Sequence, residues 1–473
     1  MTEYDAVVVG SGPNGLTAAV ELAVAGRSVL VVEGSDRLGG ACSTSPDVLS
    51  GALVDLGSAV HPFGAASPAF RDHDLDRHGL RWLQPDVLVA HPLENEPAGR
   101  LHHDRKRTLA ALGDDADRWW RLHRVVTERW DELADVVLGP PLRIPSHPIV
   151  GARYGIPGIL PSTIAERAFR TERAKALLAG AAAHAVLPLS HPLTTAFALL
   201  FGGLAHVGGW PLPRGGAQAV TDALADRLSA HGGRIEAGRW VGHVDELPSS
   251  AAVLLDLSPW NAARLLEGRL PDRYDRRLRT VDTGPALHKV DWLLDGPVPW
   301  LDDACAAAGT VHLGGTSREV AAAEAAVVKG RMPERPFVLA AQPSVVDPTR
   351  APAGRHVLWA YCHVPAGYDG DATEAIEAQF ERFAPGFRER IIERVSTDAG
   401  ALEAWNPNLR AGSLTGGTHS GLGLLRRPVF ARVPYRTPVD GVYLCSAATP
   451  PGGGVHGMCG RHAARAVLGR ELA

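Results

Sequence analysis

The sequence predicts an α/β fold whose core domain is assembled from both ends of the chain. Two observations carry this prediction. A strand, a glycine-rich turn, a helix and a second strand follow one another at the N-terminus, and a further strand, glycine-rich loop and helix close the C-terminus. The chain of 473 residues has room for two or three domains or one interleaved pair. We therefore expect a discontinuous core domain, with a second domain built from the inserts.

The N-terminal strand is predicted over Tyr4 to Gly10, where three consecutive valines are typical of a strand buried in a parallel sheet. A helix rich in Ala and Leu follows over 14–25, and Gly26 is placed to end it. The second strand is predicted over Ser28 to Glu33. This order of elements is typical of a βαβ unit.

The turn of this unit has the sequence GSGPNG, from Gly10 to Gly15. Gly10 allows the tight turn, Gly12 lets the backbone approach a diphosphate, and Gly15 lets the helix pack against the sheet. The helix N-terminus offers free N–H groups to phosphates. Glu33 ends the second strand, where a carboxylate accepts hydrogen bonds from ribose hydroxyls. A lone pattern of this kind also occurs in ordinary glycine turns, but with its strand, helix and acid it predicts a Rossmann-type dinucleotide site.

The segment EGSDRLGG, from Glu33 to Gly40, places the basic Arg37 before the paired glycines Gly39 and Gly40. This pattern resembles an extension found in amine-oxidase-like and phytoene-desaturase-like flavoproteins. The resemblance implies that Arg37 and the glycine backbone lie along the diphosphate of FAD. A nicotinamide dehydrogenase does not need this second glycine element, so we expect FAD as the cofactor.

The C-terminal stretch GVYLCSAATPPGGGVHGMCGRHAARA, from Gly441 to Ala466, predicts a strand over 442–445, a loop, and a helix from about Gly457. A helix N-terminus at this place can face the electron-rich pyrimidine edge of a flavin. The alternative is a glycine-rich turn that closes a domain.

Together these segments resemble the phytoene desaturase/carotenoid isomerase superfamily of FAD-dependent oxidoreductases. The most similar branch holds NAD(P)/FAD-dependent oxidoreductases and pyridine-nucleotide-disulfide-oxidoreductase-domain proteins. Four further segments carry the resemblance: 55–62, 214–218, 406–408 and 416–417. It implies an amine oxidase/phytoene desaturase-like FAD domain with an α+β substrate domain. Ser413 and Leu424 depart from the acidic residue and the glutamine of relatives, so the usual substrate is not assumed.

The resemblance also implies which residues surround FAD. The stretch from Gly57 to His61 is expected beside the isoalloxazine, and Gly215 and Gly216 are expected to open a helix under the cofactor. Trp240 and Val241 are expected in a strand that holds the adenine. The expected cofactor-binding residues are Gly10, Ser11, Gly12, Pro13, Asn14, Gly15, Glu33, Gly34, Arg37, Gly39, Gly40, Ala41, Gly57, Ser58, Ala59, Val60, Val241, Ala447, Gly454, Val455 and Gly457.

The FAD-binding domain is expected over 1–74, 205–285 and 400–473, and the substrate-binding domain over 75–204 and 286–399. The first insert is predicted to be mainly helical, with Trp119, Leu122, Val126 and Trp130 as packing residues near helical spacing. The second insert is predicted to hold strands over 286–294, 333–345 and 355–364.

Three residues are candidates for catalysis. Lys289 lies in an apolar strand, where it could pair with Asp291, face solvent, or hold a water near flavin N5. His61 and His456 lie in loops expected beside the flavin, and imidazole titrates near neutrality. A histidine alone in a loop is more often a structural hydrogen-bonding group than a catalytic one.

The function that these patterns favour is an FAD-dependent dehydrogenase or desaturase that transfers hydride from an apolar small molecule to flavin N5. One alternative is an amine oxidase-like flavoenzyme, which needs an aromatic cage. No pair for such a cage is obvious among 7 Tyr and 10 Phe. The other alternative is a redox-neutral double-bond isomerase or a binding scaffold. Ser413 and Leu424 suggest this alternative, because they depart from the residues of relatives.

Composition excludes several classes of protein. The net charge of −4, without blocks of like charge, argues against a nucleic-acid partner. Five widely spaced cysteines without a C-x-x-C argue against a disulfide framework or a metal site, and favour a reducing compartment.

No signal peptide is evident, so we expect a cytoplasmic protein. The apolar run from Thr195 to Val207 is too short to span a bilayer, which leaves only peripheral membrane contact open. The oligomeric state is not predicted.

Overall fold

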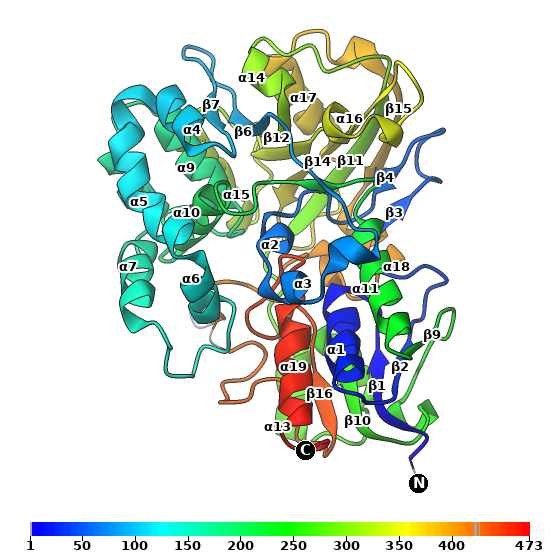
Figure 1. The fold of residues 1–473 in the computed structure, drawn as a ribbon. Helices are drawn as coiled ribbons and strands as arrows, with labels where there is room; N and C mark the ends of the chain where they lie inside the picture. Colours follow the sequence, from blue (N-terminus) through cyan, green and yellow to red (C-terminus); the bar gives the residue numbers. More distant parts are fainter. Residues whose placement is uncertain (1, 421–422, 425) are drawn as a thin grey trace.

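The computed structural model describes residues 2–420, 423–424 and 426–473 (Figure 1). A five-stranded parallel sheet has the order β16-β10-β1-β2-β9. Its strands are β1 (Tyr4–Val9), β2 (Val29–Val32), β9 (Arg234–Glu236), β10 (Ser250–Leu255) and β16 (Val442–Leu444). Three separate stretches of the chain therefore build one sheet, which confirms the predicted α/β fold.

Alternate residues of β1 face two different hydrophobic cores. Ala6 and Val8 pack with residues of α1 (Pro13–Val24), α11 (Gln218–Ala230) and α19 (Met458–Leu468). Val7 and Val9 pack with residues of α12 (Pro259–Leu265) and α13 (Asp272–Arg279). Because both faces are covered, the strand is apolar from Ala6 to Val9 and does not alternate with polar residues there.

A second, mixed sheet has seven strands in the order β15-β11-β14-β13-β12-β6-β7. They are β6 (Val87–His91), β7 (Gly99–Leu101), β11 (Ala286–Leu294), β12 (Ala308–Leu313), β13 (Val338–Ala341), β14 (His356–Val364) and β15 (Ile391–Thr397). Two small ladders pair β3 (Thr44–Ser45) with β4 (Val54–Asp55), and β5 (Trp82–Leu83) with β8 (Leu212–Pro213). The first insert thus contributes strands as well as helices to the second domain. The domain boundaries themselves stay a prediction.

The remaining α-helices are α2 (Pro62–Ala65), α3 (Pro68–Asp72), α4 (Arg105–Leu112), α5 (Ala116–Glu128), α6 (Trp130–Val137), α7 (Pro148–Gly158), α8 (Ser162–Ala165), α9 (Glu172–Ala183), α10 (Thr194–Leu204), α14 (Asp303–Ala306), α15 (Ser317–Val328), α16 (Pro343–Val346), α17 (Thr373–Phe383) and α18 (Ala399–Trp405). Helices α4, α5 and α7 lie at one edge of the molecule (Figure 1), and α6 lies between them and α19. Within the described residues, no helix is both long enough and apolar enough to cross a membrane.

Two predicted strands are shorter than expected, for local reasons. The strand predicted over 333–345 is reduced to β13, because Pro343 lacks an N–H for the ladder and begins α16. The strand expected to hold Trp240 and Val241 ends at Glu236, and Gly238 follows with φ +70°. The prediction that Trp240 and Val241 lie in a strand was therefore wrong.

The predicted alternation along β11 agrees with the packing. Val290 and Trp292 belong to one core, and the indole N–H of Trp292 donates to Glu377 of α17. Lys289 and Asp291 lie on the other face, where both are buried and paired with each other. Of the possibilities considered for Lys289, the structure therefore shows pairing with Asp291.

Candidate active site

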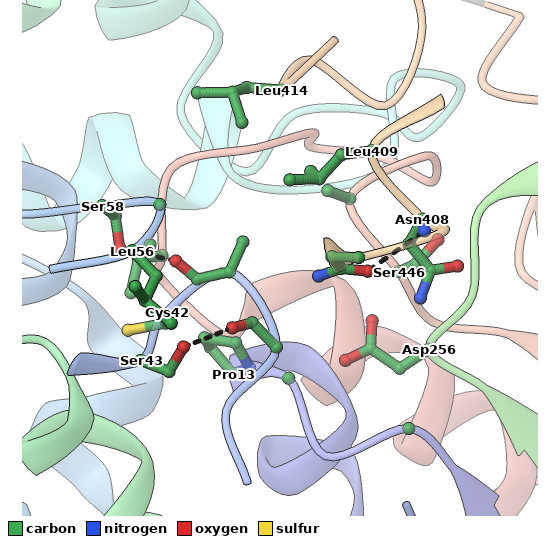
Figure 2. A pocket seen from close by; sticks show the side chains of 18 of the residues that line it. Pro13, Cys42, Ser43, Leu56, Ser58, Asp256, Asn408, Leu409, Leu414 and Ser446 are labelled. Carbon is green, nitrogen blue, oxygen red and sulfur yellow. Dashed lines mark hydrogen bonds between the residues drawn. The ribbon is translucent and has the colours of Figure 1, made fainter. Parts of the chain in front are cut away.

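A cavity of about 970 Å³ lies between the two sheets. Residues directly after β1, β2, β10 and β16 line one side of it, and Thr310, Leu339, Trp359 and Tyr361 of the mixed sheet line the other. Figure 2 shows Pro13, Asp256 and Ser446, which follow three different strands, around this cavity. Ligands of open α/β sheets bind outside the carboxyl ends of the strands, so the position itself indicates a dinucleotide site.

The glycine turn after β1 leaves no room for side chains. A Cβ at Gly12 would lie 2.6 Å from Oδ2 of Asp256, and one at Gly15 would lie 2.2 Å from the carbonyl oxygen of Gly10. Helix α1 begins at Pro13, and within the described ranges no side chain caps its N-terminus at Gly12. Asp256 takes the N–H of Gly15, so among the described residues the N–H groups of Gly12 and Asn14 are the ones available to an anion.

Glu33 is held in position by the turn that it faces. Its Oε2 accepts hydrogen bonds from N–H and Oγ–H of Ser11, at 2.8 and 2.7 Å, and its Oε1 accepts from N–H of Ser35 at 2.9 Å. These bonds orient the carboxylate at the edge of the cavity, where the sequence predicts the ribose hydroxyls.

The second glycine element, Gly39 and Gly40, packs against the glycine turn that follows β1. Gly39 and Gly40 have φ values of +105° and +54°, and N–H of Gly39 donates to Oγ of Ser11 at 3.1 Å. Arg37 lines the cavity, but its guanidinium donates to the carbonyl of Thr44 and to Asp47. The position of Arg37 thus agrees with the expectation, while its hydrogen bonds are made within the protein.

The C-terminal loop carries strain where it meets the cavity. Gly454 has φ +136°, and the β-branched Val455 has φ +52°, a conformation that such residues rarely adopt. A Cβ at Gly460 in α19 would lie only 1.8 Å from the carbonyl oxygen of Asn14, so α19 and α1 cross in close contact near their N-termini. Backbone strain of this kind persists where the surrounding structure supports a functional site.

Residues 14–468 of the chain match the family model of the flavin containing amine oxidoreductases. The chain belongs to this family. The pyridine nucleotide-disulfide oxidoreductase domain-containing protein 2 of Rattus norvegicus is 26% identical, over 99% of this chain and 94% of its own. The phytoene desaturase (neurosporene-forming) of Rhodobacter capsulatus is 27% identical, over 96% and 92%.

Solved structures share the fold. An oxidoreductase from Methanosarcina mazei superposes with a TM-score of 0.63 at 17% identity, covering 98% of this chain and 100% of its own. Putrescine oxidase bound to putrescine superposes with a TM-score of 0.60 at 20% identity, covering 99% of each chain. Together with the family, these findings confirm the predicted resemblance, the FAD cofactor and the class of FAD-dependent oxidoreductase.

Most residues expected to bind FAD line the cavity of this flavoenzyme. The exceptions are Gly15, Gly39 and Gly457, which shape the turns behind it. Gly215 and Gly216 lie outside the lining as well; they precede α11, and N–H of Gly215 donates to Asp347. The roles of all these residues toward FAD stay predictions that the geometry accommodates.

At the expected adenine end, Trp240 and Val241 line the cavity from a loop. A Cβ at Gly34 would lie 2.7 Å from the indole of Trp240, so the ring lies directly against the loop that follows β2.

Of the two departures from relatives, Ser413 lines the cavity and donates to the carbonyl of Thr283 at 2.7 Å. Leu424 is not among the lining residues.

The three candidate catalytic residues do not line the cavity. Burial lowers the pKa of both His61 and His456 to about 4, so both are neutral near pH 7. Nδ1 of His456 accepts from N–H of Met458 at 3.1 Å, which is a structural bond within the loop. Lys289 lies behind Trp359, with Nζ 5.8 Å from the centre of its ring. Their catalytic roles remain untested predictions without support from the cavity geometry.

Aromatic residues gather on the cavity wall opposite the glycine turns, and no sequence pattern marks them. His184 stacks on Phe201 at 4.2 Å between ring centres, and Trp359 meets Tyr361 edge-on at 5.3 Å. Trp210 completes the group. Burial lowers the pKa of His184 to about 3, so it is an uncharged member of the wall. The absence of an obvious aromatic pair in the sequence therefore did not mean that the site lacks aromatic residues.

Asp256 is a further cavity residue that was not predicted. It directly follows β10, and its Oδ2 accepts from N–H of Gly15 at 2.8 Å. Burial, and secondarily the charge of Glu33, raise the pKa of Asp256 to about 7, although the Gly15 bond opposes them. Its place after a parallel strand is the one signal that could have marked it.

The raised pKa of Asp256 predicts pH-dependent binding of FAD. The diphosphate is anionic and favours the neutral acid, so FAD binding takes up a proton above the pKa of Asp256. Affinity should fall about tenfold as the pH rises from one unit below this pKa to one unit above it. Fluorescence titration of the apoprotein with FAD measures the dependence. Asp256→Asn keeps the acceptor for Gly15 and should remove the slope; an unchanged slope in this variant would refute the assignment.

Replacement of Glu33 tests the ribose contact. Below the pKa of Asp256, Glu33→Gln should weaken FAD binding about tenfold, because a charge-assisted hydrogen bond contributes about 1.5–3 kcal/mol. The same titration provides the measurement, with Glu334→Gln, an exposed residue outside the cavity lining, as the control. Unaltered affinity of the Glu33 variant would show that the ribose lies elsewhere.

Proposed function

We propose that this flavoenzyme oxidises an uncharged, largely apolar small molecule. The observation that carries the proposal is the distribution of charge around the cavity. The acidic residues that line it in the described structure are Glu33 and Asp256, and the basic ones are Arg37, Arg239 and Arg264. All five lie on the dinucleotide side, so the opposite wall offers a substrate no formal charge to pair with.

The opposite wall is suited to positioning an apolar molecule. Large side chains are presented by Phe201 of α10, by Trp210 of the loop before β8, and by Leu339, Trp359 and Tyr361 of the mixed sheet. Bound FAD supplies a hydride acceptor at N5. The wall residues exclude water and hold the carbon–hydrogen bond against that face, and burial raises the pKa of Tyr361 so that its phenol stays protonated. The phytoene desaturase relative is consistent with such a substrate.

Amine oxidation is the second candidate, because aromatic residues do line the cavity and the fold resembles putrescine oxidase. A protonated amine entering the site would have no carboxylate on the aromatic side among the described lining residues. Burying the ammonium group without a carboxylate partner would cost free energy, which favours oxidation of an uncharged molecule over oxidation of an amine. A redox-neutral isomerase is the third candidate. It is suggested by Ser413, which lines the cavity and departs from the acidic residue of relatives.

The test compares alcohols with primary amines of the same carbon skeletons, mixed without oxygen with the FAD-loaded protein. We expect bleaching of the visible flavin band by uncharged members of the panel and not by the amines. Bleaching by amines, with peroxide release once oxygen is admitted, would support the amine oxidase instead. A change in double-bond geometry of added alkenes without net flavin reduction would support the isomerase.

We also propose a cytoplasmic location, in agreement with the five buried free cysteines. Peripheral contact with a membrane remains a prediction of the sequence.

A further inference from the structure

Helix α7 has an apolar face that the described part of the chain leaves exposed. Val150, Tyr154 and Gly158 are buried, and the phenol of Tyr154 donates to the carbonyl of Ala196 in α10 at 2.9 Å. The helix is thus anchored by one face. On the other face Ile149 and Ile156 are 69% and 73% exposed.

The exposed apolar stripe continues beyond the helix. Ile159 is 59% exposed, and Leu160 and Ile164 are exposed as well. Isolated exposed apolar residues are common, and a surface helix normally places polar side chains on its outer face. Within 149–164 large aliphatic side chains are instead exposed repeatedly, which is typical of an interaction surface.

Arginines flank this stripe. A hollow of about 640 Å³ between α5 and α7 is lined by one acid, Glu128, and by the arginines Arg118, Arg121, Arg124, Arg129 and Arg153. Arg118 pairs with Asp115 and Arg129 with Glu132. For the other three arginines, no ion pair with a carboxylate is formed by the part of the chain that the structure describes.

The isoleucine stripe and this arginine hollow are parts of one surface, called here the α5–α7 surface. Arg153 lies between Ile149 and Ile156 along α7, and Pro157 of the same helix lines the hollow. The surface lies at the edge of the molecule away from the parallel sheet (Figure 1). Apolar side chains at the centre with unpaired cations beside them match the boundary between acyl chains and phosphate groups.

We propose that the α5–α7 surface docks on a bilayer that contains anionic phospholipids. The isoleucines would enter the acyl boundary, and the arginines would bind lipid phosphates. A second copy of the chain fits less well, because a two-fold interface over this patch would bring the arginine hollows together. Nucleic acid would pair with the arginines but leave the isoleucines in water.

Docking at this surface would place the cavity wall near the bilayer. Helix α7 packs on α10, and α10 contributes Phe201 to the aromatic wall. An apolar substrate dissolved in the membrane would then be close to the site. The docking proposal does not depend on the proposed function, since lipid binding is measured without turnover.

The experiment is flotation of the FAD-loaded full chain with phosphatidylcholine vesicles, with and without phosphatidylglycerol. We expect the protein to float with the anionic vesicles and to bind them at least about tenfold more tightly than neutral ones. Joint replacement of Ile149, Ile156 and Ile159 by serine should weaken binding at least about tenfold. Joint replacement of Arg121, Arg124 and Arg153 by glutamine should remove the preference for anionic lipid.

Leu301→Ser and Ile392→Ser are the matched controls, because these aliphatic residues are 73% and 47% exposed at other places. They should bind vesicles like the parent chain. Equal FAD content and thermal midpoint in all variants verify folding. The proposal is overturned if the parent chain does not float, if the isoleucine variant floats equally well, or if size-exclusion chromatography shows a dimer that this variant abolishes.

Discussion

Replacing Gly12 by valine is expected to weaken FAD binding more than a hundredfold, to the point where the purified protein is colourless. A Cβ at this position would lie 2.6 Å from Asp256, and the rest of the side chain would fill the cavity beside the α1 N-terminus. The backbone N–H groups could then no longer approach the diphosphate. A loss of this size corresponds to about 3 kcal/mol or more of binding free energy. Equilibrium titration of the apoprotein with FAD measures it.

The control is Gly155→Val in α7, where an added Cβ would meet nothing within 4 Å. This variant should bind FAD like the parent chain. Circular dichroism of both variants separates loss of the cofactor from loss of the fold. Stoichiometric FAD in a folded Gly12 variant would contradict the assignment of the glycine turn to the diphosphate.

Replacing Arg350 by methionine is expected to lower the free energy of unfolding by about 3–5 kcal/mol, because it leaves a buried carboxylate without its cation. Arg350 and Asp55 have fully buried side chains and lie 2.7 Å apart. Oδ1 of Asp55 also accepts from Oγ of Thr44 at 2.7 Å and from N–H of Ala217 at 2.8 Å. This cluster joins the segment before Gly57 to the start of α11 and to the mixed-sheet domain. Its loss should loosen the cavity as well as the fold.

Urea unfolding of the apoprotein measures the effect, and the exposed Arg355→Met serves as the matched control with an expected change below about 0.5 kcal/mol. The double variant Arg350→Met with Asp55→Asn should be less destabilised than the two single changes summed, since no charge is then left buried. A loss under about 1 kcal/mol for Arg350→Met would show that the pair does not hold this junction together.

The parts of the site that the sequence predicts are those made by neighbouring residues. Gly10, Gly12 and Glu33 belong to one βαβ unit, where strand, turn and helix follow directly and each residue type has a local reason. The place of the C-terminal loop around Gly454 could be predicted for the same reason, because a strand precedes this loop and a helix follows it. Such local patterns predicted the fold class and the cofactor, and the structure and the family confirm both.

Features made by tertiary contact could not be predicted in this way. The aromatic wall combines His184, Phe201 and Trp359 from elements far apart in the chain, so no spacing reveals it. Asp256 acquires its role only because β10 lies beside β1 in the parallel sheet. The strand at Trp240 was expected from the family resemblance, whereas in this chain β9 ends at Glu236 and Gly238 follows with a positive φ.

Hydrogen exchange of the apoprotein and the FAD-loaded protein tests the central claim most directly, namely that FAD lies between the two ends of the chain. We predict that FAD slows exchange in two separate segments, from Gly10 to Gly15 and from Gly453 to Gly457, with further protection around Ser58. Protection of the N-terminal segment alone, or of neither segment, would contradict the account.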